Sequence, residues 1–128
     1  MKFHHFGLIV SSIIDFEKKF IYEEKVAEVI DSLQNAKLSL YKNYSDSFIE
    51  LIEPLSSKSF TWNHLNNVNS SPYHHFCYEV SDHSELNFIE SKYRLLPILG
   101  PVPAKLFNDR EVAFFYTRSK MIVEFLIH

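Results

Sequence analysis

The chain contains a single cysteine, Cys77, among 128 residues. It therefore has no internal disulfide and no metal motif of the paired-cysteine kind, which fits a reducing cytoplasm. Long apolar runs are also missing, since every run is short and broken by charge, and the opening MKFHHF is too polar for a secretory signal. We expect a cytoplasmic protein with no membrane span.

A strong excess of charge of either sign is absent as well. The net charge is −3 and the pI is near 6.1, which gives no general attraction to phosphate backbones and argues against nucleic acid as a partner. With 46% hydrophobic residues the chain can bury a real core, but its length leaves no room for a second domain of ordinary size. We expect one domain over residues 1–128.

The chain does contain a pattern of histidine and glutamate that occurs twice. His5 opens the apolar run HFGLIVSSI and is followed 45 residues later by Glu50 in FIELIEP. His75 opens HFCYEVSD and is followed 49 residues later by Glu124 in MIVEFLI. The similar spacing predicts two related modules, at about 1–56 and 73–128, joined by a connector at about 57–72.

Each module shows nearly the same order of predicted elements. In the first, alternation over residues 3–10 predicts a strand with His5 on one face, and Ser12 caps a short helix through IIDFEKKF. Segments 24–31 and 37–44 and the run FIELIEP then predict three strands.

The second module repeats this plan. Phe76, Tyr78 and Val80 share one face of its first strand, and Asp82 caps a helix. The proline-rich LLPILGPVPAKLFNDR predicts a shaped loop beside a cleft, and EVAFFYTR with MIVEFLI predicts a hairpin.

A lone histidine at the start of a strand is usually a surface or core residue, but four residues at symmetric positions favour a metal site. His5, Glu50, His75 and Glu124 offer two imidazoles and two carboxylates, which suit one divalent ion such as Zn, Ni, Co or Mn. Such an ion would polarise a substrate carbonyl and stabilise the charge formed when the adjacent carbon loses a proton.

Several residues are candidates for the chemistry around the ion. Glu124 or Glu50 could leave the ion and act as the base. Glu79, predicted to point the same way as His75, is a candidate second acid or base. The substrate pocket is predicted to be lined by aromatic residues near the proline-rich segment: Phe107, Phe115 and Tyr116.

The motifs HHFGLIVSSI, FIELIEPL, HHFCYEVSD and REVAFFYTRSKMIVEFLI resemble those of the vicinal oxygen chelate superfamily (glyoxalase, bleomycin resistance and dioxygenase proteins). The similarity is greatest to its methylmalonyl-CoA epimerase and glyoxalase I-like branch, and it covers nearly the whole chain. The resemblance implies an α+β fold of two βαβββ modules that form a curved, cleft-bearing half-barrel sheet with helices on the convex side. It also implies that the four histidine and glutamate residues are the metal ligands.

The sequence also departs from that branch. Where such epimerases have a histidine-proline-lysine turn followed by glycines, this chain has YTRSKM, and where they often have glutamine it has Glu50. The set of two histidines and two glutamates is equally similar to metal-dependent bacterial glyoxalase I.

Three functions follow as hypotheses. The first is a metal-dependent isomerase or epimerase acting on a small acyl thioester or 2-oxo compound, and the second is a lactoylglutathione lyase of the glyoxalase I kind. The third is a non-enzymatic small-molecule-binding protein of the bleomycin-resistance type, although such binders typically lack the complete ligand set. The resemblance and the exposed sheet edges also predict a homodimer.

Overall fold

The order βαβββ occurs twice in the computed structural model of the chain, which describes residues 1–67 and 71–128. The predicted α+β class and the predicted pair of βαβββ modules are confirmed. The first repeat consists of β1 (Lys2–Ile9), α1 (Ile13–Glu17), β2 (Glu24–Asp31), β3 (Ala36–Lys42) and β4 (Phe48–Pro54).

The second repeat begins after a short connecting helix. This helix lies within the connector predicted at about 57–72. Residues 68–70 of the connector lie outside the described part of the chain. The elements are α2 (Trp62–Leu65), then β5 (Tyr73–Val80), α3 (His83–Tyr93), β6 (Leu96–Ala104), the 3-10 helix η1 (Lys105–Phe107), β7 (Arg110–Tyr116) and β8 (Ile122–Ile127). No helix of residues 1–67 or 71–128 has the length and apolar character needed to cross a bilayer.

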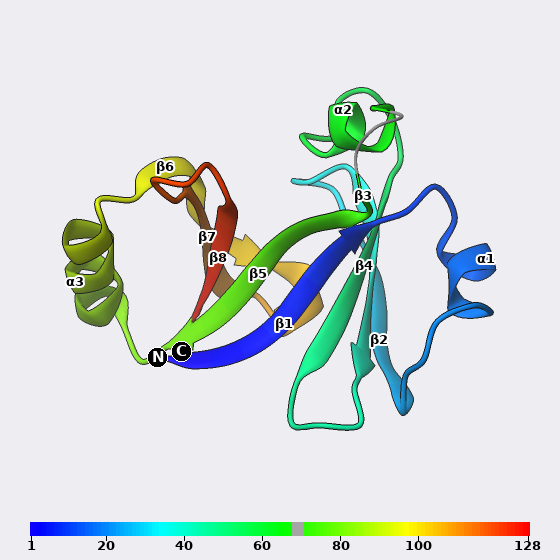
Figure 1. Ribbon diagram of the computed structural model, residues 1–128, viewed down its shortest axis with the longest axis horizontal. Coiled ribbons are helices and arrows are strands. Elements are labelled where there is room, and N and C mark those ends of the chain that lie inside the picture. The colour runs from blue at the N-terminus through cyan, green and yellow to red at the C-terminus, as the bar shows by residue number, and fades with distance from the viewer. Residues whose placement is uncertain (68–70) are drawn as a thin grey trace. The chain divides into compact units, whose positions relative to one another are not determined.

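The chain forms two units, and strand β1 contributes to both. Met1–His5 and His75–His128 make up what we term the C-terminal unit, and Phe6–His74 make up the N-terminal unit. In the C-terminal unit the strand order is β1-β5-β8-β7-β6, and in the N-terminal unit it is β2-β3-β4-β1. β5 and β8 run parallel and β7 and β8 form the predicted antiparallel hairpin (Figure 1).

Both helices of the repeats begin at the predicted caps. The Ser12 side chain accepts a hydrogen bond from the backbone N–H of Asp15, and the Asp82 side chain accepts one from the N–H of Glu85 at 2.8 Å. Each bond satisfies a backbone donor that the helix itself leaves without a partner. The ends of α1 and α3 are therefore set locally by sequence.

The prediction of a loop at the proline-rich segment was wrong. Residues 96–104 form β6, which pairs with β7 through two irregularities in register. β6 is the last strand in the order of its unit, and proline is tolerated at such an edge because its missing N–H faces no partner strand. Gly100 is required here, since it has φ +89° and a Cβ atom would collide with the carbonyl of Val112.

Alternation along the strands places one apolar face under each helix. In the N-terminal unit, Val10, Ile13, Tyr41 and Leu51 form a buried cluster. In the C-terminal unit the buried cluster joins α3 to the alternate residues of β5, β7 and β8: Val80, Leu86, Ile89, Leu95, Ala113, Phe115, Val123, Phe125 and Ile127. The side chains at the intervening positions of these strands point to the face away from the helix.

We expect the substitution Asp82→Ala to lower the free energy of unfolding by about 1 kcal/mol, because the N–H of Glu85 loses its acceptor. Urea denaturation measures this change. The matched control is Asn87→Ala on the exposed side of α3, where alanine is the better helix former and stability should hold or rise. Equal losses in both variants would contradict the role of the cap.

Candidate metal centre

Three side chains of the C-terminal unit meet at one buried point. His5 on β1, His75 on β5 and Glu124 on β8 are 0%, 0% and 2% exposed. The Nε2 atoms of the two histidines are 3.1 Å apart, and Oε2 of Glu124 lies 3.1 Å from that of His5 and 3.0 Å from that of His75. The three donor atoms therefore form a nearly equilateral triangle.

Strand pairing explains how Glu124 arrives there. β5 and β8 run parallel with Cys77 opposite Glu124, so the glutamate lies two residues along from His75 on the neighbouring strand. Its chain neighbours Val123 and Phe125 belong to the apolar cluster beneath α3. Since successive side chains of a strand point to opposite faces, Glu124 projects to the face away from the helix.

The triangle has the dimensions of a ligand set. Donors about 2.1 Å from an ion are about 3.0 Å apart when adjacent in an octahedron and about 3.4 Å apart in a tetrahedron. The observed 3.0–3.1 Å matches one face of an octahedron. Oε2 of Glu124 is buried and, within residues 1–67 and 71–128, has no hydrogen-bond partner of acceptable geometry despite the two nearby nitrogens. A cation would satisfy it.

The charges in this cluster also suit a cation. Burial lowers the pKa of His5 and outweighs the opposing effect of Glu124, so its imidazole is neutral. Burial alone would raise the pKa of Glu124, but the contacts with His5 and His75 more than offset it and hold that pKa far below its ordinary value. An ionised carboxylate facing neutral imidazole is the state in which these groups bind divalent metals.

Glu50, the fourth predicted ligand, belongs to the N-terminal unit. It lies on β4 opposite Leu40 of β3 and is 4% exposed. β4 is the fourth strand of the first repeat, as β8 is of the second, so Glu50 and Glu124 occupy equivalent positions in the two repeats. An ionisable group buried to this degree requires a polar partner.

His4 contacts His5 on the side of its ring away from the triangle, which the sequence pattern did not indicate. Its Nδ1 lies 2.8 Å from Nδ1 of His5, the ring nitrogen that faces away from the triangle. Burial, with His5 close by, lowers the pKa of His4 to about 4, so this ring is neutral too. The doubled histidine in HHF was the only signal for it. Phe107 of η1 stacks on the His5 ring at 5.6 Å and meets His4 edge-on.

The remaining predicted residues are more scattered. Glu79 is partly buried and accepts a hydrogen bond from Arg110 at 2.9 Å. Burial alone would raise the pKa of Glu79, but the hydrogen bond from Arg110 and the nearby His4 and His128 outweigh burial, so the pKa is lowered. Phe115 packs in the apolar cluster beneath α3, and Tyr116 is 44% exposed. Instead, Phe114 meets the ring of His75, at 5.4 Å.

A second set of donor atoms overlaps the first. His4, His5 and Cys77 offer two ring nitrogens and a buried sulfur within 4.8 Å of one another. It shares His5 with the triangle, so the two sets cannot bind separate ions at full strength. Only the triangle contains a carboxylate, the ligand preferred by the harder divalent ions.

The chain was compared with known proteins. No protein-family model matches it, and no curated protein matches it either. Among solved structures, a hypothetical protein from Bacillus halodurans C-125 has a TM-score of 0.82 at 23% identity, with 99% of this chain and 94% of that chain covered.

Two further structures are epimerases by name. The methylmalonyl-CoA epimerase of Mycobacterium tuberculosis has a TM-score of 0.80 at 16% identity, with 98% of this chain and 87% of that one covered. A variant of the Streptomyces coelicolor enzyme in complex with 2-nitronate-propionyl-CoA has a TM-score of 0.78 at 16% identity, with 99% and 96% covered. Identities this low show the fold and nothing finer. The chain has the vicinal oxygen chelate fold that its sequence motifs predicted.

Proposed function

We propose that the protein is a divalent-metal-dependent isomerase or epimerase that removes a proton next to the carbonyl of a small acyl thioester or 2-oxo compound. The observation that carries this proposal is the buried triangle of His5, His75 and Glu124, with a carboxylate oxygen left without a hydrogen-bond partner among the described residues. The fold shared with methylmalonyl-CoA epimerases supports the substrate class.

Glu50 is proposed as the fourth ligand, on the strength of its burial and its equivalence to Glu124 in the repeat. Two imidazoles and two carboxylates suit Zn, Ni, Co or Mn. An ion of five or six ligands would leave positions open for substrate oxygen.

The chain's own residues would divide the chemistry as follows. A bound divalent ion would act as a Lewis acid on the substrate carbonyl and so acidify the adjacent C–H. His5 and His75, both fully buried, would hold the ion through their Nε2 atoms. We assign the role of proton acceptor to Glu124 or Glu50, since each is a buried carboxylate and a proposed ligand.

Epimerisation also requires an acid or base on the other side of the carbon. Glu79 is less available for this role, because its carboxylate already accepts a hydrogen bond from Arg110 at 2.9 Å. We therefore propose that one of Glu50 and Glu124 removes the proton and that the other is the acid or base on the opposite side of the carbon. We also propose that the protein is a homodimer and that it is cytoplasmic.

Metal binding by this set is directly testable. Metal-free protein titrated with Co²⁺ should take up one equivalent, with visible absorption of an ion of high coordination number. His75→Ala should weaken binding more than about 100-fold, since loss of a direct ligand exceeds the effect of losing an outer partner. Glu50→Gln should weaken it too. Cys77→Ala is the matched control, and a loss of binding there instead would assign the ion to the overlapping set with His4.

The activity is tested by proton exchange at the carbon beside the carbonyl. Metal-loaded protein in D₂O with methylmalonyl-CoA should replace the hydrogen at that carbon by deuterium, as followed by ¹H NMR, and His75→Ala should lose this activity while keeping its circular dichroism spectrum. Turnover of methylglyoxal with glutathione, and no exchange, would favour the glyoxalase I alternative. A protein that cannot be loaded with metal would favour the binding protein.

His4 is proposed to fix the tautomer of His5. Two neutral rings with Nδ1 atoms 2.8 Å apart share one proton, so one Nδ1 donates and the other accepts. If His5 is the donor, its Nε2 presents a lone pair to the triangle, as a metal ligand must.

Long-range ¹H–¹⁵N NMR correlation on metal-free protein should therefore show His5 protonated at Nδ1. His4→Leu removes the acceptor and should shift His5 toward the Nε2–H tautomer and weaken Co²⁺ binding about 10- to 100-fold. His4→Gln, whose amide oxygen can accept the same bond, should restore part of the affinity. An Nδ1 of His5 without a proton in the unsubstituted protein would contradict this role.

A further inference from the structure

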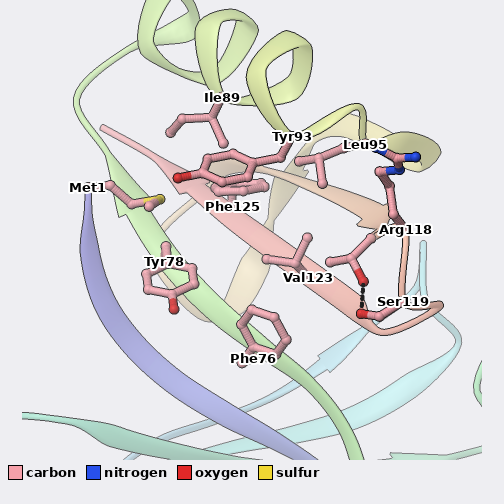
Figure 2. A pocket seen from close by; sticks show the side chains of 11 residues that line it. Met1, Phe76, Tyr78, Ile89, Tyr93, Leu95, Arg118, Ser119, Val123 and Phe125 are labelled. Atoms are coloured by element: carbon pink, nitrogen blue, oxygen red, sulfur yellow. Dashed lines mark hydrogen bonds between the residues drawn. The ribbon is translucent and has the colours of Figure 1, made fainter.

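The C-terminal unit contains a cavity on the side of its sheet that faces helix α3. Its volume is about 510 Å³, and Figure 2 shows side chains of α3 facing those of β5 and β8 across it. Most of the lining is apolar or aromatic, with a polar segment from the turn between β7 and β8. The lining residues are Met1, Phe76, Tyr78, Ile89, Tyr93, Leu95, Thr117, Arg118, Ser119, Val123 and Phe125.

This cavity is separate from the candidate metal centre. Val123 and Phe125 flank Glu124 in sequence, and Phe76 follows His75, so strand alternation sends the two sets to opposite sides of the sheet. The cavity also opens to solvent, because Tyr93 is 50% exposed and Met1 58% exposed. A molecule in it would contact no proposed metal ligand.

The charges of the lining point to an anionic ligand. Among the described residues that line the cavity, Arg118 has the one charged side chain, and none has a carboxylate. Arg118 is exposed and, within the described residues, pairs with no acid, in contrast to Arg110 with Glu79. Lys92 places its ammonium group 5.4 Å from the ring centroid of Tyr93, which adds a second positive charge near the same wall.

Hydroxyl groups stand beside Arg118 in the turn. The hydroxyls of Thr117 and Ser119, the chain neighbours of Arg118, bond to each other at 2.9 Å. Figure 2 shows the end of the Arg118 side chain extending away from Ser119. A guanidinium binds carboxylate oxygens well, because hydrogen bonds between charged groups are the strong ones. Beyond this polar edge the walls are Phe76, Val123 and Phe125, which suit an alkyl chain or an aromatic ring.

We propose that this cavity, termed the α3 cavity, binds an amphipathic carboxylate such as a medium-chain fatty acid or an arylalkanoate. The apolar body lies between α3 and the sheet, and the carboxylate meets Arg118 at the turn. The volume falls within the range of about 300–1,000 Å³ that is usual for small-molecule sites. The site does not depend on metal, so it stands or falls independently of the proposed activity.

The test uses decanoate and metal-free protein kept in chelator, with binding measured by isothermal titration calorimetry. We expect one decanoate per chain. Arg118→Gln should weaken binding about 10- to 100-fold, because a charged hydrogen bond is lost. Lys120→Gln in the same turn does not line the cavity and should bind as the unsubstituted protein does. Decanol should bind as weakly to the unsubstituted protein as decanoate does to Arg118→Gln.

Two further variants test whether decanoate occupies the α3 cavity itself. Ser119→Trp places a large ring at the exposed edge of the cavity and should block decanoate without disturbing the fold, whereas His75→Ala, on the other face, should leave decanoate binding intact. Equal binding of decanol and decanoate would overturn the proposal in favour of unspecific apolar adsorption. A protein that self-associates in sedimentation, binds no decanoate and becomes monomeric in Ser119→Trp would show that a second copy covers this surface instead.

Discussion

The buried carboxylate of Glu124 is the constraint on which the candidate site depends. It is ionised, almost fully removed from water and opposed by two imidazoles whose nitrogens lie within 3.1 Å without hydrogen-bonding geometry toward Oε2. A carboxylate in such surroundings is unfavourable unless a positive charge accompanies it. The packing of Phe107 against His5 and of Phe114 against His75 restricts both rings, so the site is held in a shape that could accept a cation.

Strand alternation lets β5 and β8 serve two purposes at once. Their residues on one face are His75, Cys77 and Glu124, and those on the other form the apolar cluster and the α3 cavity. The parallel pairing of these strands follows from the βαβββ order, since α3, β6 and β7 intervene between them. The same repeat that generates the ligand positions thus also generates the surface beneath the helix.

Much of this arrangement is encoded locally and was predictable. The caps at Ser12 and Asp82 and the strand that carries His75 follow from hydrogen-bonding groups and apolar alternation a few residues apart. Their outcome does not depend on distant contacts. The spacing of histidine and glutamate then indicated which positions would be equivalent in the two repeats.

The features that could not be predicted share a dependence on tertiary pairing. Prolines in residues 96–104 suggest a loop until β7 supplies a partner and the strand becomes an edge. Phe115 and Phe114 cannot be assigned to a face until the register of β7 with β8 is known, and that register directs Phe115 toward α3 and Phe114 toward His75. The alternation of side chains along β1 does not reveal how the adjacent rings of His4 and His5 orient.

The membership of Lys2–His5 in the C-terminal unit bears on how the chain folds. His5 and Glu124 are 119 positions apart, and the strands between β1 and β8 must be in place before they meet. Contacts so distant along the chain close large loops at an entropic cost that slows folding. During synthesis His5 therefore cannot meet Glu124 until β8, the last strand of the chain, has been made.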